Sequence, residues 1–340
     1  MKLKKNSLLT LALASLISCS QEETIYSSGN EAIVFDNAFV ENTTRAAYDG
    51  SYTTNSLSGF QVYGTITNKQ GQTGNIFNNV NVNKNGNAWT YNVGTQYWIP
   101  GNGYSFAATV HGNEGSAIST EVDAYYMPTA IVVNDMSVQK DILYAANGPI
   151  AADATTWGET VSFTFQHLLA KVKFTVWNTI TTQNGYHYKV ENITIQNAAN
   201  QGKYIAGSGW DATATADYTF KPDFGHAVDV AEPVAEAIAE GTLIAVGKKY
   251  ESQYERLLLP GKLQFTIRFD YYLYNGTQVI DTQENKTITS PEMTLEAGKA
   301  YNFNIKLGNP GEPITFDVNK VADWDTDHND DGEDDETEIK

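Results

Sequence analysis

Residues 264–273 read QFTIRFDYYL, and this stretch decides the fold class. Apolar and aromatic side chains occupy every odd position from Phe265 to Leu273, whereas the even positions begin with Gln264, Thr266, Arg268 and Asp270. A strict period of two predicts a β-strand with one face in a core and the other toward solvent. The same alternation recurs at residues 33–39, 60–66, 89–93, 104–110 and 301–307, between clusters of Asn, Gly, Thr and Ser.

These strands predict an all-β protein with two tandem antiparallel β-sandwich domains and little helix. A chain of 340 residues has room for two domains of ordinary size. We expect the boundary at the flexible triplet Gly207-Ser208-Gly209, with domains over residues 46–207 and 208–322 and an acidic tail over 323–340. The best helix candidate is residues 232–240, EPVAEAIAE.

The inward face changes within FTFQHLLAKVKFTV, residues 163–176. Phe163, Phe165 and His167 have odd numbers, whereas Val172 and the apolar residues after it have even numbers. A strand cannot change face without an extra residue, so we expect a bulge or a tight corner at residues 168–170. His167 lies on the apolar side and is interpreted as a hydrogen-bonded structural histidine rather than a metal ligand.

The first 18 residues predict a lipoprotein signal peptide. A lysine-rich head precedes an apolar run too short to span a bilayer, and Leu16-Ile17-Ser18-Cys19 forms a lipobox. Cys19 is therefore expected to carry acyl chains such as palmitate that hold the mature protein on the outer membrane. The alternative is a chance cysteine after an ordinary secretory signal. Residues 20–23, SQEE, resemble the acidic surface-export tags of lipoproteins and favour the cell exterior.

Composition excludes several classes of function. The net charge of −18 argues against binding of nucleic acid or of anionic lipid surfaces. Cys19 is the only cysteine, so no disulfide framework or thiolate metal site is available. We find none of the sequence-readable catalytic signatures, neither HExxH nor GxSxG nor a phosphate-binding loop, so we expect no enzyme and no cofactor.

Two features suggest binding. The acidic tail fits the D-x-N-x-D-G-x₅-E template of a calcium loop, with Asp327, Asn329, Asp331 and Glu338 as ligands. A solvated, disordered tail is the competing interpretation, because so many acids match such templates easily. The chain could also be a monomeric surface lipoprotein that binds glycans through an aromatic platform, for which the candidates are Trp89, Trp98, Trp157 and Trp210.

A series of segments in a fixed order resembles a known family. They are FQVYGT from residue 60, IFNNVNV from residue 76, WTYNVGTQYWIPGNGYSFAA from residue 89, FTFQHLLAKVKFTV from residue 163, LLLPGKLQFTIRF from residue 257, LEAGKAYNFNIKL from residue 295 and ITFDVNKVADW from residue 314. Together they look like a Mfa-like fimbrillin, a subunit of Bacteroidales type V pili. The resemblance covers nearly the whole mature chain.

The resemblance implies two transthyretin-like β-sandwich domains, export as a lipoprotein and trimming by an arginine-specific protease. Thr44-Arg45-Ala46 matches the trimming position, so residues 19–45 would be a lipidated propeptide. An ordinary linker arginine is the alternative. Trimming would remove the strand that carries Ile33, Val34, Phe35 and Phe39 and leave a groove for a strand from another subunit. The donor candidate carries Ile314, Phe316 and Val318.

Partners on this interpretation are other fimbrial subunits and a host or bacterial surface receptor, and adhesion is the expected role. The position of the subunit, in the stalk, at the tip or at the anchor, stays open.

Overall fold

The chain is all-β in a computed structural model that describes residues 31–40, 52–111, 116–181, 185–219, 226–227, 243–251, 255–264 and 266–321. Within these ranges the one helical element is the 3-10 turn η1 (Met136–Val138). None of the described helices is long and apolar enough to span a membrane. The predicted helix at residues 232–240 lies outside the described residues.

The N-terminal core is enclosed by one strongly curled sheet. Its order among the described residues is β1-β9-β8-β5-β2-β3-β4. The two ends of the sheet approach each other, since Ala32 forms an antiparallel bridge with Tyr97 just beyond β4. The strands are β1 (Phe35–Val40), β2 (Gly59–Thr67), β3 (Thr73–Asn85), β4 (Ala88–Tyr91), β5 (Gly103–Val110), β8 (Leu143–Ile150) and β9 (Val161–His167).

The C-terminal core lies between two facing sheets. One has the order β13-β15-β10-β21-β22, with β16 beside β10, and the other β19-β18-β11-β7-β6, with β12 and β14 beside β11. The strands of the first are β10 (Ala170–Asn178), β13 (His226–Ala227), β15 (Lys249–Glu251), β16 (Arg256–Leu258), β21 (Ala300–Leu307) and β22 (Thr315–Val321). Those of the second are β6 (Ile118–Val122), β7 (Pro128–Val133), β11 (Tyr186–Ile205), β12 (Gly209–Thr219), β14 (Ile244–Ala245), β18 (Thr266–Asn275) and β19 (Gln278–Thr289). A short pair, β17 (Gly261–Leu263) and β20 (Met293–Leu295), stands apart.

Strand β18 shows the alternation that the sequence of residues 264–273 predicts. Ile267, Phe269 and Leu273 are buried, whereas Arg268 and Asp270 are only partly covered. Two pairings depart from the antiparallel prediction: β1 runs parallel to β9, and β10 runs parallel to β21. Strand β10 is covered on both faces, as is typical of a parallel strand at the centre of a sheet.

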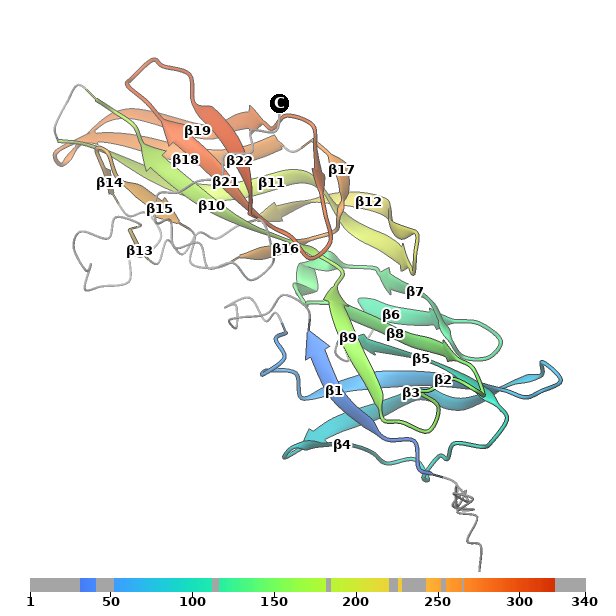
Figure 1. Ribbon diagram of the computed structural model, residues 1–340. Coiled ribbons are helices and arrows are strands. Elements are labelled where there is room, and N and C mark those ends of the chain that lie inside the picture. The colour runs from blue at the N-terminus through green and yellow to red at the C-terminus, as the bar shows by residue number, and fades with distance from the viewer. Residues whose placement is uncertain are drawn as a thin grey trace, which may run out of the picture.

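The chain passes from the N-terminal to the C-terminal domain between β9 and β10 (Figure 1), and the division between the two cores lies at residue 168. Phe165 belongs to the N-terminal core, and Leu168 is the next apolar residue and belongs to the C-terminal core. This confirms the predicted corner, because β9 ends at His167 and β10 begins at Ala170. The boundary predicted at Gly207–Gly209 is corrected: these residues form the turn of the β11–β12 hairpin, where positive φ angles of 78° and 86° require glycine.

The β6–β7 hairpin crosses from one domain to the other. It is inserted between β5 and β8 of the N-terminal sheet, yet β7 pairs with β11 of the C-terminal sandwich. Its residues Ile118, Ile131 and Val133 are buried in the C-terminal core. A strand inserted from the first domain therefore completes the sheet of the second.

Candidate functional site

The candidate site is the space that residues 31–40 fill at the edge of the N-terminal core, here called the β1 slot. Strand β1 lies on one side against β9, with Phe35 opposite Val161 and Asp36 opposite Ser162. On the other side, the residues before β1 lie along residues 96–98. Residues 31–40 therefore close the curled sheet.

Phe35 fills the centre of the slot and is only 3% exposed. Its ring lies within contact of five others, at centroid distances of 5.4–6.2 Å, namely Phe60, Phe77, Tyr91, Phe106 and Phe163. Burial of one such side chain contributes roughly 1.5–3 kcal/mol, and each well-placed ring pair adds about 0.5–1.5 kcal/mol. Phe35 is therefore an integral part of the N-terminal core.

Main-chain hydrogen bonds hold both sides of the segment. The Ile33 N–H donates to the Gln96 carbonyl over 2.8 Å, and the Val161 N–H donates to the Val34 carbonyl over 2.9 Å. The Tyr91 hydroxyl donates to the Ile33 carbonyl over 2.8 Å. Burial raises the pKa of Tyr91, which keeps this hydroxyl protonated and able to donate. Loss of the segment would leave these groups without their present partners.

A bulge in β1 changes which side chains enter the slot. Ile33, Phe35, Ala38 and Val40 are buried, whereas Phe39 is 52% exposed. The register against β9 shifts between Asp36 and Phe39, so three residues of β1 span two of β9 and the inward parity changes from odd to even. The prediction that Phe39 shares the inward face of Ile33 and Phe35 was wrong. Val34, whose parity already predicted an outward side chain, is 46% exposed.

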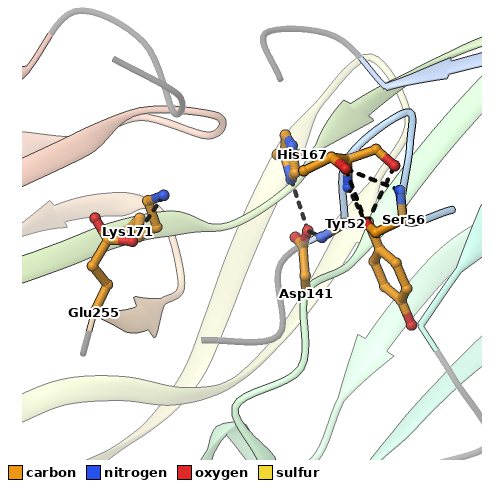
Figure 2. A network of polar contacts seen from close by, with 7 residues as sticks. Tyr52, Ser56, Asp141, His167, Lys171 and Glu255 are labelled. Carbon is orange, nitrogen blue, oxygen red and sulfur yellow. Dashed lines mark hydrogen bonds and ion pairs between the residues drawn. The ribbon is translucent and has the colours of Figure 1, made fainter. Parts of the chain in front are cut away.

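The chain that follows the expected cleavage bond is anchored at the domain boundary (Figure 2). The Tyr52 N–H donates to Asp141 Oδ2 over 2.9 Å, and the same oxygen lies 2.8 Å from His167 Nδ1. The side chains of Asp141 and His167 are each at most 1% exposed. His167 therefore lies buried against a carboxylate at the domain boundary. Lys171, at the start of β10, forms a further ion pair with Glu255 over 2.9 Å.

The predicted donor segment forms β22, at the edge of the C-terminal sandwich. It pairs along its whole length with β21, with Phe316 opposite Ile305. Ile314, Phe316 and Val318 are partly buried against the C-terminal core, and the Phe316 ring lies 5.6 Å from that of Phe303. The other edge of β22 is unpaired in the described part of the chain.

The remaining predicted sites are the lipidation and cleavage residues and the calcium ligands of the tail. Cys19, Arg45 and Ala46 and the tail residues Asp327, Asn329, Asp331 and Glu338 lie outside the described residues. Groups of three or more His, Cys, Asp or Glu residues with metal-site geometry do not occur among the residues that are described.

The four tryptophans proposed for a glycan platform do not form one. Trp98 and Trp89 are at most 9% exposed in the N-terminal core. Trp157 and Trp210 are partly covered, and their Nε1 atoms donate to the Asn102 and Leu168 carbonyls. These indoles therefore pack within the domains: two are buried in the N-terminal core, and the other two are partly covered and donate to backbone carbonyls.

Comparison with known proteins shows which family the chain belongs to. A family model described as fimbrillin-like matches residues 44–324. The chain belongs to the fimbrillin-like family. This fimbrillin-like protein is accordingly a non-enzymatic fimbrial component that assembles with other fimbrial subunits at the cell surface.

One solved structure supports the same fold, and a second is similar over most of its length. A fimbrial protein from Bacteroides vulgatus superposes with a TM-score of 0.66 and 16% identity, over 87% of this chain and 100% of that one. A candidate cell adhesion protein from Bacteroides uniformis has a TM-score of 0.46 and 15% identity, over 88% of this chain and 99% of that one. No curated protein sequence is similar to the chain.

Proposed function

We propose that this fimbrillin-like protein is exported as a lipoprotein on Cys19, trimmed after Arg45 and polymerised by strand exchange to serve adhesion. The observation that carries the proposal is the β1 slot. Its occupant precedes Arg45 in sequence, contributes buried side chains such as Phe35 to the core, and pairs at a sheet edge. Removal of the occupant exposes an apolar groove beside an unpaired strand, which is the form of site that accepts a strand from another chain.

The arginines of the chain support a single cut. There are three, and Arg256 and Arg268 lie in the paired strands β16 and β18. Proteases act preferentially on accessible chain outside such ladders. In the sequence, Arg45 lies between β1 and Tyr52, whose N–H donates to Asp141, so a cut after Arg45 separates the slot's occupant from the rest of the domain without breaking a described strand pair.

The test uses the full-length chain with Cys19→Ser, treated with an arginine-specific protease. We expect a new N-terminus at Ala46 by mass spectrometry, and a ladder of sizes on gels of unboiled samples that collapses on boiling. The matched control is the same chain with Arg45→Ala, which should keep residues 31–40 and stay monomeric. A trimmed protein that unfolds or remains monomeric would contradict the proposal. Lipidation is tested separately, by metabolic labelling of the native chain and of its Cys19→Ser variant with an alkyne fatty acid.

A further inference from the structure

The loop between β4 and β5 carries no charge, although the net charge of the chain is −18. Residues 85–113 contain no Asp, Glu, Lys or Arg, and the loop occupies residues 92–102 of this stretch. Most of the loop is exposed, and its exposed side chains include Val93, Tyr97 and Ile99. An acidic protein therefore presents an uncharged and partly apolar surface at this loop.

The apolar side chains of the loop continue onto the segment before β1. Ala32 forms an antiparallel bridge with Tyr97, and residues opposite each other in such a pair have their side chains on the same side. Trp98 is fully buried, so Tyr97 and Ile99 on either side of it point outward. Val34 points outward from the same face as Ala32. Val34, Tyr97 and Ile99 are each 46–47% exposed and form one contiguous surface, here called the apolar row.

The apolar row lies where the folded domain begins. Strand β1 runs toward the C-terminal domain, so its start lies at the end of the N-terminal domain that points away from the C-terminal domain (Figure 1). The Trp98 N–H donates to the Glu31 carbonyl over 2.8 Å, which places the row beside the first described residue. Only residues 20–30 separate Glu31 from Cys19, and a chain of this length reaches at most about 40 Å.

We infer that in the untrimmed protein the apolar row lies against the lipid surface to which Cys19 is attached. The inference rests on the lipid attachment in the proposed function and adds to it a contact made by the folded domain. A tether of this length holds the row at a high effective concentration near the lipid, so a contact that is weak by itself becomes populated. The partner is a lipid surface because the row adjoins the chain that leads to the anchor.

The chemistry of the loop suits the region between lipid headgroups and acyl chains. An uncharged loop enters this region without the cost of removing ionic groups from water. Tyr97 has an apolar ring and a polar hydroxyl, and tyrosine is enriched at the membrane interface for this reason. The Lys69 side chain lies against Gly101 beside the row, and a lysine in such a place extends its ammonium group toward the headgroups.

Trimming after Arg45 would end the contact. The cut removes Val34 from the row and separates the domain from Cys19 at the same time. Tyr97 and Ile99 then remain without a tether, and two exposed apolar side chains alone do not hold a protein on a membrane. The contact with lipid is therefore a property of the untrimmed chain.

The test uses the chain from Cys19 onward, coupled through its single thiol to maleimide lipids in phosphatidylcholine vesicles. This coupling supplies the tether without lipidation in the cell. Tyr97→Trp places a fluorescent reporter in the row, and brominated lipids quench a tryptophan that contacts them. The matched control is Tyr125→Trp, because Tyr125 is also 47% exposed and lies in the turn between β6 and β7, where Asn75 donates to its carbonyl. Fluorescence of the parent chain is subtracted from that of each variant.

We expect the quenching at position 97 to be at least about threefold stronger than that at position 125. Addition of Val34→Ser and Ile99→Ser to the Tyr97→Trp chain should reduce its quenching to the level of the control, with circular dichroism to verify the fold. Equal quenching at positions 97 and 125 would overturn this inference alone. A native chain that takes up no alkyne fatty acid would remove the proposed lipidation, and this inference with it.

A second copy of the chain is the competing occupant of the row. Sedimentation of the untrimmed Cys19→Ser chain without vesicles tests it, and we expect a monomer. A dimer that Val34→Ser and Ile99→Ser together abolish would assign the row to contacts between copies and would overturn the inference.

Discussion

Replacement of Phe35 by alanine tests whether the first strand is part of the N-terminal core. The side chain is 3% exposed and contacts five rings. Loss of a buried phenylalanine costs about 3–5 kcal/mol in free energy of unfolding. The matched control is Phe39→Ala, in the same strand but 52% exposed, which should change that free energy by no more than about 0.5 kcal/mol.

The assay is urea unfolding of the untrimmed Cys19→Ser chain, followed by tryptophan fluorescence. Trp89 and Trp98 are buried in the N-terminal core and report on it. With a slope of ~1–3 kcal/mol per molar urea, Phe35→Ala should lower the midpoint of the N-terminal transition by at least ~1 M relative to Phe39→Ala. Equal midpoints for the two variants would refute the assignment of β1 to the core, and with it the reason for expecting an apolar groove after trimming.

Three further predictions concern the scaffold. Asp141→Ala leaves the Tyr52 N–H without its acceptor and the buried His167 without its carboxylate, and it should lower the free energy of unfolding by about 1–3 kcal/mol, measured by urea titration; no measurable loss would contradict a structural role for the pair. Burial raises the pKa of Tyr301 to about 12, so stability that is present below pH 10 should be lost between pH 10 and 12, and Tyr301→Phe should flatten this loss in thermal melts at pH 9 and 11. Gly64→Ala should cost about 1–3 kcal/mol, because a Cβ there would lie 2.9 Å from a Phe77 ring atom, whereas Gly74→Ala has an ordinary 3.8 Å contact and should melt close to the parent.

Periodicity alone predicted the fold class and most strands, since residues such as Ile267 and Phe269 alternate without interruption. Periodicity failed at Phe39 because the bulge arises from the pairing of β1 with β9. The register of that pairing cannot be deduced from the sequence of β1 alone. The direction in which neighbouring strands run could not be predicted from periodicity either. Parallel pairing of β1 with β9 depends on which strands become neighbours, not on the alternation within either.

The domain boundary was misplaced for a related reason. The triplet at residues 207–209 is glycine-rich because a hairpin turn needs positive φ, and such turns and linkers have the same composition. The change of inward parity between Phe165 and Val172 carried the correct information, since it marks where the chain leaves one core for the other.

The crossing hairpin β6–β7 means that no single peptide bond separates the two domains into complete halves. A cut at residue 168 leaves the C-terminal sheet without the strands at its β11 edge, and a cut before residue 118 divides the N-terminal sheet between β5 and β8. The two domains are therefore joined by the β7–β11 ladder as well as by the covalent link at Leu168. Separation of the domains requires these main-chain hydrogen bonds to break, whereas two domains joined by a flexible linker alone would separate without that cost.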